Sequence, residues 1–367
     1  MNVFILAGEP SGDEYGAKLM QELKAINSNI SFSGIGGTLM EKQGLQSIAS
    51  LKKMSVMGFF EVIKTLPFFL KLEKNILKII KEKKPEKIIL IDYPGLNLRL
   101  APKIKSIIKT KIYYYISPQI WAWKEKRIEI IKKHIDKMIV IFEFEKKWYQ
   151  KRGVNVEYVG HPFLDIWEKN QTDDIIQKYN INIKRPILTL FPGSRKQEIK
   201  QHLELLINTA FQIKHKIPAL QILLGLHPNI NLKQEMKKEI IIIRDQPLKA
   251  LEIGHCAIVA SGTATLQAAI MKTPTIVVYK MNKLSWCLTQ KMVQVNYASM
   301  ANIIAEEEVF PEYLQSNANV HNLSNTAYQI FNDENYKQKL TQKIALINNK
   351  IGLSGASKKA ASYILNN

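Results

Sequence analysis

The sequence predicts an α/β protein built from two doubly wound, Rossmann-like halves. Its 367 residues, 46% hydrophobic and 23% charged, suit two globular domains at about 150 residues per domain. Short apolar runs rich in β-branched residues alternate with helical segments, and this alternation pauses at the polar stretch 168–182 before it restarts. Because near-continuous apolar runs are typical of parallel strands covered on both faces, each half is expected to be a parallel sheet between helices.

The first half contains six runs that are expected to be strands. They cover residues 2–7, 30–35, 87–92, 111–116, 137–142 and 156–159. Helices are expected between them, for example at 14–25, 98–109 and 128–134. Strand–helix–strand repetition of this kind builds a doubly wound sheet.

The second half repeats the pattern. Strands are expected at 186–191, 220–226, 240–244, 257–260 and 275–279, with a helix at 198–214. The last segment, 324–367, is expected to be mostly helical and able to pack back on the first half. We therefore predict an N-terminal domain over 1–165, a second domain over 166–345, and a C-terminal helix over 346–367 that returns to the N-terminal domain.

The charge balance narrows the class of partner. Lysine and arginine total 52 and aspartate and glutamate 32, for a formal net charge of +20. Such an excess predicts an acidic partner: nucleic acid, anionic lipid or a phosphorylated substrate. The two cysteines, Cys256 and Cys287, are too few for a disulfide framework and form no metal motif, which favours a reducing, cytosolic location.

Neither a signal peptide nor a membrane span is expected. Residues 1–7 lack the basic start of a signal peptide. The most apolar stretch, 54–70, contains Glu61, Lys64 and Pro67 and falls short of the roughly 20 apolar residues that a membrane helix needs. The sequence therefore predicts a soluble or peripheral protein.

Two loops that follow expected strands have the composition of anion sites. Pro192-Gly193-Ser194-Arg195 opens a helix, so its glycine, its free amides and the guanidinium could bind a diphosphate. Ser261-Gly262-Thr263-Ala264 repeats this logic after a later strand. Ligands of open α/β sheets bind beyond the carboxyl ends of the strands, so both loops are expected to face one nucleotide diphosphate. The alternative for the first loop is an ordinary turn with a solvated arginine, and the alternative for the second is a plain helix N-cap.

Other sites are disfavoured by the motifs that the sequence lacks. Neither loop is a Walker A motif, and residues 8–13 do not read Gly-x-Gly-x-x-Gly, so a dinucleotide coenzyme is poorly supported. No cluster of His, Cys or Asp has metal-ligand spacing, so neither a metal nor a cofactor is expected.

Two aspartates sit in loops at the carboxyl ends of strands. Asp92 directly precedes Tyr93-Pro94-Gly95, where a carboxylate could act as a general base or could simply shape the turn. Asp13 is expected to cap the following helix, with a contact to a polar substrate as the alternative.

The segment 117–124 also follows a strand. It places Trp121 and Trp123 beside Gln119 and Lys124. These side chains could line a sugar or acyl pocket, or both rings could pack in the core.

Residues 52–84 interleave aromatic side chains with lysines. One helical stripe can face the core; it consists of Phe59, Ile63, Leu66, Leu70, Leu77 and Ile80. Phe60, Phe68 and Phe69 lie off this stripe, among lysines. Such a surface suits the interface of an anionic membrane, and the alternative is a buried crossover with a solvated lysine face.

Taken in order along the chain, these motifs resemble the lipid-A-disaccharide synthase family. The resemblance covers roughly residues 1 to 315. Its most specific match is the segment Tyr115-Ile116-Ser117-Pro118-Gln119-Ile120-Trp121-Ala122-Trp123. The other matches are Ala7-Gly8-Glu9-Pro10-Ser11-Gly12-Asp13, Val56-Met57-Gly58, Ile91-Asp92-Tyr93-Pro94 with Asn97, Val159-Gly160-His161-Pro162, the two anion loops and Asn302.

The resemblance implies a glycosyltransferase of GT-B architecture, with two Rossmann-like domains facing across a cleft. It implies condensation of UDP-2,3-diacylglucosamine with 2,3-diacylglucosamine 1-phosphate to a β-1,6-linked disaccharide 1-phosphate and UDP, in the lipid A pathway of Gram-negative bacteria. It also implies work at the cytoplasmic face of the inner membrane, on an anionic surface and without a bound metal. A nucleic-acid partner is not implied, and a homodimer is left open.

The resemblance also assigns roles to residues. Gly193, Ser194 and Arg195, together with Ser261, Gly262, Thr263 and Ala264, would hold the UDP diphosphate, and Asp92 would deprotonate the acceptor's 6-hydroxyl. The acceptor-site candidates are Ser11, Asp13, Ser117, Gln119, Trp121 and Asn302, and the acyl-chain or membrane candidates are Met57, Phe59, Phe60, Phe68 and Phe69. Gln267 stands where family members carry a ribose-binding glutamate, and an amide lacks the charge for a charge-assisted bond there. Position 95 is glycine where an acidic residue is often found, so Asp92 is the one acid of its turn.

Two rival functions remain open at this point. One is a UDP-sugar epimerase or another glycosyltransferase on the same architecture, against which the aromatic–lysine segment and the segment 117–123 favour an acylated acceptor. The other is RNA binding, which the charge of +20 permits but for which no nucleic-acid module is recognised.

Overall fold

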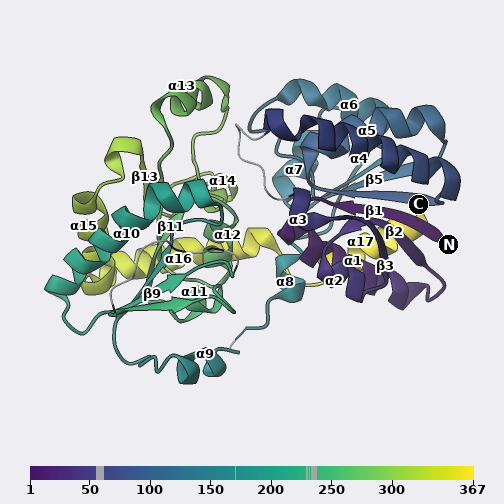
Figure 1. Ribbon diagram of the computed structural model, residues 1–367. Coiled ribbons are helices and arrows are strands. Elements are labelled where there is room, and N and C mark those ends of the chain that lie inside the picture. The colour runs from purple at the N-terminus through teal and green to yellow at the C-terminus, as the bar shows by residue number, and fades with distance from the viewer. Residues whose placement is uncertain (55–61, 170, 229, 231, 233–237) are drawn as a thin grey trace. The chain divides into compact units, whose positions relative to one another are not determined.

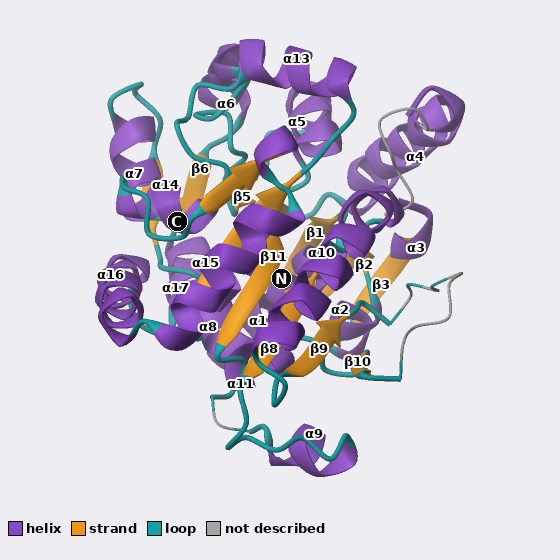
Figure 2. Ribbon diagram, turned by 90° about the vertical axis from the view of Figure 1, so that its left-hand side faces the viewer, coloured by secondary structure: helices purple, strands orange, loops and turns teal. Residues whose placement is uncertain are grey.

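The chain divides into two compact units, which are described separately. The computed structural model describes residues 1–367 except 55–61, 170, 229, 231 and 233–237. Unit 1 consists of Met1–Trp167 and Ile351–Asn367, and unit 2 of Glu168–Lys350. The divisions lie close to residues 165 and 345, where the sequence places its domain boundaries. Strands of both units lie among helices (Figures 1 and 2).

Unit 1 contains a parallel sheet of seven strands in the order β3-β2-β1-β4-β5-β6-β7. The strands are β1 (Asn2–Ala7), β2 (Ser31–Gly36), β3 (Leu45–Ser50), β4 (Lys87–Ile91), β5 (Lys111–Tyr115), β6 (Lys137–Val140) and β7 (Val156–Tyr158). The chain first adds strands on one side of β1 and then crosses to β4 on the other side. The strand order therefore reverses between β1 and β4, which is where open α/β sheets bind ligands.

The helices of unit 1 form two layers, one on each face of this sheet (Figure 1). In one layer α1 (Pro10–Ile26) packs with α2 (Thr38–Lys42), α8 (Phe163–Ile166) and α17 (Ala356–Asn366). In the other, α4 (Val62–Lys83) packs with α5 (Pro94–Ile107), which packs with α6 (Ile128–His134). The remaining helices are α3 (Leu51–Met54), the 3₁₀ turn Glu125–Arg127 and α7 (Glu143–Gln150).

The C-terminal helix returns to unit 1, as the sequence predicts. Asp165 fixes its start, because the carboxylate of Asp165 accepts hydrogen bonds from the backbone amides of Gly355 and Ser357. A carboxylate at this end also complements the positive end of the helix dipole. The two helices before it, α15 (Val320–Asn332) and α16 (Glu334–Ile351), belong to unit 2 apart from the last residue of α16.

Unit 2 contains a parallel sheet of six strands in the order β10-β9-β8-β11-β12-β13. The strands are β8 (Ile187–Phe191), β9 (Gln221–Gly225), β10 (Ile240–Ile243), β11 (Cys256–Ala260), β12 (Thr275–Tyr279) and β13 (Glu312–Leu314). The other helices are α9 (Asp173–Lys178), α10 (Lys196–Lys216), α11 (Lys249–Ile253), α12 (Thr263–Ile270), α13 (Lys283–Met292), α14 (Met300–Ala305) and the 3₁₀ turn Gln315–Asn317. The strand order reverses between β8 and β11.

Among the strands that the structure describes, the sequence patterns identify all except two at sheet edges. Strand β3 reads Leu-Gln-Ser-Ile-Ala-Ser and is only partly buried, and β13 has three half-buried residues. An edge strand needs no continuous apolar run, so neither segment carries the signal used for the buried strands. Among the described residues, no helix is long and apolar enough to cross a membrane.

Candidate active site

The reversal point of the unit 1 sheet brings two loops together. Strands β1 and β4 are neighbours with Ala7 paired to Ile91, so the loop that starts at Gly8 lies beside the one that starts at Asp92. Burial raises the pKa of the Asp92 carboxyl to about 7, and the nearby charge of Glu9 adds to this. A carboxylate with a pKa near neutrality is a stronger base than an ordinary aspartate, and it can accept a proton at physiological pH.

The turn that carries Asp92 has an unusual backbone. Asp92 and Tyr93 are both left-handed, with φ of 43° and 47°. Left-handed backbone costs ordinary side chains about 1–2 kcal/mol per residue, and such strain is found preferentially at functional sites. Gly8 makes room for the turn, because a Cβ at Gly8 would lie 2.3 Å from ring atoms of Tyr93.

Two side chains hold the main chain of this turn. The carbonyl oxygen of Asp92 accepts a hydrogen bond from Tyr114 Oη and one from Asn97 Nδ2, each at 2.6 Å. Asn97 Nδ2 also donates to the carbonyl of Ile91 at 3.2 Å. The backbone amide of Asp92 donates to the carbonyl of Tyr115 at 2.9 Å, so the turn is fixed on both sides of its first residue.

The loop after β5 is held by a buried acid that the sequence analysis did not single out. Glu145 Oε1 accepts hydrogen bonds from Ser117 Oγ at 2.8 Å and from Trp121 Nε1 at 3.0 Å. Burial raises the pKa of Glu145 to about 7. The only signal in the sequence was a glutamate in the first turn of an amphipathic helix, which is ordinary for an exposed capping residue.

This network changes the interpretation of two acceptor candidates. The polar atoms of Ser117 and Trp121 bind Glu145, and both residues are buried, so they shape the loop from inside the unit. That position corrects the expectation that they bind the acceptor directly. Gln119, in the same loop, is exposed at the surface of unit 1.

Asp13 is also a structural residue. It lies inside α1, and its carboxylate accepts hydrogen bonds from the backbone amides of Gly37, Leu39 and Met40 at 2.7–3.1 Å. It therefore caps the N-terminus of α2 instead of the helix that follows its own loop, and it is 6% exposed. This corrects both its predicted cap and its place among the acceptor candidates. Ser11, in the first turn of α1, is half-buried.

The acyl-chain candidates of residues 52–84 fall into two groups. Met57, Phe59 and Phe60 lie outside the described residues. Phe69 is 7% exposed and belongs to the core between the sheet and α4, and Phe68 packs edge-on against it with ring centroids 5.2 Å apart. The expectation that Phe69 faces a membrane is therefore wrong, because its ring is covered by the core.

The reversal point of the unit 2 sheet brings the two anion loops together. Strands β8 and β11 are neighbours with Phe191 paired to Val259, so Pro192 and Ser261 follow adjacent strand ends. Gly193 has a φ of +116°, a conformation that L side chains rarely adopt, and a Cβ there would lie 2.5 Å from Glu198 Cβ. The glycine is therefore required by both backbone and space.

The amides of the first loop already bind a carboxylate. Glu198 Oε2 accepts hydrogen bonds from the amides of Ser194 at 2.9 Å and of Arg195 at 3.2 Å. The guanidinium of Arg195 lies 3.7 Å from Glu198 Oε1, and its side chain is 66% exposed. An internal anion thus occupies amides that the sequence analysis expects to bind phosphate.

A buried histidine connects this loop to the end of β12. His202 Nδ1 lies 3.1 Å from the carbonyl of Pro192, and His202 Nε2 accepts a hydrogen bond from the amide of Lys280 at 2.8 Å. The acceptor role of Nε2 requires Nδ1 to carry the proton, so the ring is neutral. Burial lowers the pKa of His202, which agrees with that assignment.

The second loop is open where a ligand could approach. Gly262 and Thr263 are exposed, and a Cβ built on Gly262 would meet no described atom within 4 Å. Ser261 Oγ donates to the carbonyl of Ala298 at 2.6 Å, so it orders the loop. Ala264 and Gln267 are half-buried on α12, within and just beyond its first turn.

Asn302 is fully engaged inside unit 2. Its Oδ1 accepts hydrogen bonds from the amides of Val309 and Phe310, and its Nδ2 donates to the carbonyl of Phe310 and to Glu312 Oε1. The side chain is fully buried and joins α14 to the start of β13. This corrects its place among the acceptor candidates, since a ligand would have to displace these bonds.

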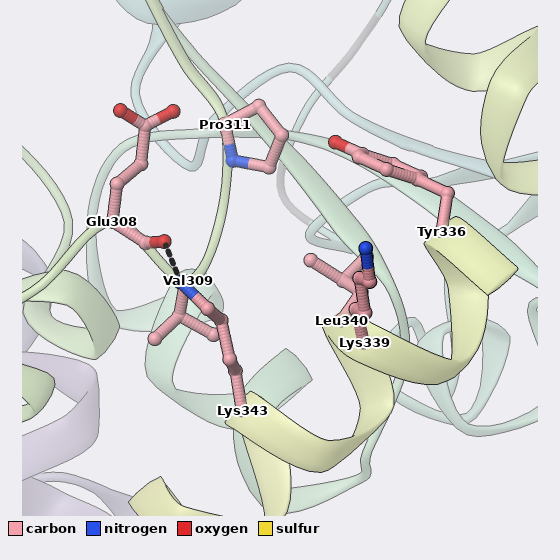
Figure 3. A pocket seen from close by; sticks show the side chains of 7 residues that line it. All are labelled: Glu308, Val309, Pro311, Tyr336, Lys339, Leu340 and Lys343. Carbon is pink, nitrogen blue, oxygen red and sulfur yellow. Dashed lines mark hydrogen bonds between the residues drawn. The ribbon is translucent and has the colours of Figure 1, made fainter.

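A cavity of about 200 Å³ in unit 2 lies away from these loops. Figure 3 shows its lining, which includes Pro311 and the α16 side chains Tyr336, Lys339 and Lys343. Pro311 directly precedes β13, which runs parallel to β12. The cavity is therefore at the amino ends of the strands, whereas Gly193 and Gly262 are at the carboxyl ends.

Comparison with protein families gives one consistent result. A family model described as lipid-A-disaccharide synthetase matches residues 3–364. A lipid-A-disaccharide synthase of Coxiella burnetii (strain CbuK_Q154) is 34% identical over 100% of this chain and 98% of its own length. A lipid-A-disaccharide synthase 1 of Legionella pneumophila (strain Philadelphia 1) is 36% identical over 96% of this chain and 94% of its own length.

Comparison with solved structures identifies the architecture. A UDP-GlcNAc 2-epimerase from Neisseria meningitidis, solved with UDP-GlcNAc, has a TM-score of 0.69 over 100% of both chains at 13% identity. A sucrose-phosphate synthase from Thermosynechococcus elongatus has a TM-score of 0.61 at 12% identity, over 100% of this chain and 98% of its own. The likeness shows the GT-B fold, with two Rossmann-like α/β units, as the sequence predicts.

Proposed function

The chain belongs to the lipid-A-disaccharide synthase family of glycosyltransferases, and from this membership we propose that it joins two acylated glucosamine units. The donor is UDP-2,3-diacylglucosamine and the acceptor is 2,3-diacylglucosamine 1-phosphate. The products are a β-1,6-linked disaccharide 1-phosphate and UDP.

In this proposal unit 2 binds the donor. Its two loops lie side by side at the carboxyl ends of β8 and β11; a helix begins directly after the first loop and within the second, at Thr263. Backbone amides and the exposed guanidinium of Arg195 would stabilise the diphosphate, whose negative charge grows as the bond to the sugar breaks. Gln267 would offer the ribose a neutral hydrogen bond, which lacks the charge assistance that a carboxylate would give.

Asp92 of unit 1 is the general base in this proposal. It takes the proton from the acceptor's 6-hydroxyl while that oxygen forms a bond to the anomeric carbon of the donor. The bond from that carbon to the diphosphate oxygen breaks, and its electron pair leaves with UDP. Because the attack comes from the face opposite the leaving group, the anomeric configuration inverts. The single observation that supports this role best is the raised pKa of Asp92 at the reversal point of its sheet.

The acyl chains of both substrates place the reaction at a bilayer, so we also propose peripheral binding at the cytoplasmic face of the inner membrane. In the described part of α4, Leu70 is 45% exposed and Lys71, Lys74 and Lys81 are exposed on the same side of the helix. An exposed apolar residue among lysines suits an anionic lipid surface. Glu73, buried against Arg99 and Lys103, ties α4 to α5 and so holds this surface in place.

The direct test is product formation. The protein is incubated with both acylated sugars, and UDP and the disaccharide 1-phosphate are scored by mass spectrometry. The proposal expects both products in equal amounts. A parallel reaction with UDP-GlcNAc alone tests the epimerase alternative. The proposal would be overturned if the sugar of UDP-GlcNAc changed its configuration without release of UDP and the first reaction gave no disaccharide.

A further inference from the structure

The carbonyl oxygen of Asp92 is held by two buried side chains at once. Tyr114 Oη reaches it from β5 and Asn97 Nδ2 from α5, both at 2.6 Å. Both side chains are fully buried. A carbonyl oxygen has two lone pairs, so these two donors saturate it.

The two donors are more than core packing. A phenylalanine in place of Tyr114 and a small apolar residue in place of Asn97 would fill most of the same space. They would do so without burying polar groups, which are costly unless they find hydrogen-bond partners. Burial raises the pKa of the Tyr114 hydroxyl well above its usual range, so it remains a donor at every pH at which the protein is used. Asn97 also donates to Ile91, the last residue of β4, so it spans the junction between the strand and the turn.

The bonded carbonyl belongs to the peptide that joins the two left-handed residues. Asp92 and Tyr93 have φ of 43° and 47°. Rotation of this peptide toward the right-handed region would swing the carbonyl away from both donors. The same rotation would redirect the Asp92 side chain, because the carboxylate branches from the Cα at which the backbone turns.

We propose that Asn97 and Tyr114 are positioning residues, which hold the Asp92 main chain in its left-handed turn and thereby aim its carboxylate at the acceptor hydroxyl. The inference rests on the proposed role of Asp92 as base. Neither residue touches substrate in this scheme; both act through Asp92. A catalytic group that is misplaced by about 1 Å can lose about a hundredfold in rate.

The test uses Tyr114→Phe and Asn97→Ala, with Tyr113→Phe as a matched control. Tyr113 precedes Tyr114 on β5, its ring is equally buried, and its hydroxyl accepts a hydrogen bond from Lys87 Nζ at 3.0 Å, so the control removes the same atom from the same strand. Rates are expressed per folded molecule, counted by the stoichiometry of UDP binding. Tyr114→Phe and Asn97→Ala are expected to lower kcat about tenfold to a hundredfold with little change in the KM for the donor, while Tyr113→Phe keeps the wild-type kcat.

A double-mutant cycle separates positioning from general damage. In an Asp92→Asn background, the two substitutions should lower the residual rate no further, because the group through which they act is gone. Two outcomes would overturn the inference and leave the role of Asp92 intact. One is that the losses are additive in the Asp92→Asn background. The other is that both single variants keep the wild-type kcat while Asp92→Asn is slow. A wild-type rate for Asp92→Asn itself would instead remove the proposed base.

Discussion

The carboxylate of Glu198 accepts a hydrogen bond from the backbone amide of Ser194, with Oε2 and the amide nitrogen 2.9 Å apart. The amide of Arg195 donates to the same oxygen. In the free protein this loop therefore holds an internal anion at the N-terminus of α10. A diphosphate that approaches the loop would meet this negative charge.

Replacement of Glu198 by glutamine is expected to strengthen UDP binding. The amide keeps an oxygen that can accept from Ser194 but removes one charge beside the diphosphate, and a single charge near a protein surface is worth about 1 kcal/mol or somewhat more. Calorimetry should show a Kd for UDP lowered about fivefold. Glu204→Gln removes a charge from an exposed position on the same helix and should leave the Kd unchanged. Weaker binding by Glu198→Gln would mean that Glu198 supports the loop in its binding form.

Replacement of Arg195 by alanine is expected to act in the opposite direction. The guanidinium is largely exposed in the free protein, so its loss should leave the melting temperature unchanged while the UDP Kd rises about tenfold or more. Lys200, an exposed cation on the same helix, supplies the control, and Lys200→Ala should bind UDP almost normally. Equal Kd values for the two variants would exclude Arg195 from the donor site.

The membrane proposal now concerns the exposed side of α4. Changing Lys71, Lys74 and Lys81 together to glutamine should weaken binding to anionic vesicles, since each near-surface lysine contributes about 1 kcal/mol. The loss should shrink at high salt, because surface charges are screened. The control changes Lys42, Lys358 and Lys359, which are exposed on the other helical layer of unit 1. If both triple variants lose vesicle binding equally, net charge and not this surface governs the interaction.

Asp92 should make the protein less stable at alkaline pH. Its pKa rises from an ordinary 3.8 to about 7, so between these values the folded state binds more protons than the unfolded state. The free energy of unfolding therefore falls as pH rises, and the upper limit of this loss at pH 8 is about 4 kcal/mol. The loss is smaller than this limit because the side chain is half-buried and water reaches it. Asp92→Asn should melt above wild type at pH 8, with the gap closing toward pH 4. A gap independent of pH would show that the carboxyl is not destabilised by burial.

His161 should have the reverse pH dependence. Burial lowers its pKa from 6.5 to about 4, and its Nδ1 accepts a hydrogen bond from the amide of Phe163 at 3.2 Å. Between these values the unfolded state binds more protons, so about 3 kcal/mol of stability is lost as pH falls from 6.5 to 4. His161→Asn keeps an acceptor for Phe163 and does not titrate, so its unfolding free energy should fall less steeply over this range. An unchanged slope for His161→Asn would contradict the assignment.

The sequence predicts the sheets well because buried parallel strands carry continuous apolar runs. It also predicts that residues 193 and 262 lie in loops that directly follow strands, and the structure adds that the two strands are neighbours. The expectation for Phe69 is wrong because the buried stripe is Phe69, Leu72, Ile76 and Ile80; it shares Ile80 with the predicted stripe but has Phe69 and Ile76 in place of Leu70 and Leu77. Each residue turns a helix by about 100°, so a one-residue shift is enough to exchange core and surface.

The internal bonds of polar residues could not be predicted in the same way. Asp13, Ser117 and Asn302 are polar residues of the types found in binding sites. Only the fold shows that their side chains already form hydrogen bonds inside the protein, to backbone amides or to Glu145. The left-handed turn at Asp92 depends equally on contacts with β5 and α5 that local sequence does not encode.

The role of Asp92 is tested most directly by the single-turnover rate of Asp92→Asn with both acylated substrates bound, at pH 8, alongside its UDP Kd. Asparagine keeps the size of the side chain but cannot take the hydroxyl proton. We expect the rate of disaccharide formation to fall about a hundredfold to ten-thousandfold, with a UDP Kd equal to that of wild type. A rate close to wild type would contradict the proposed mechanism, whatever the variant does to stability.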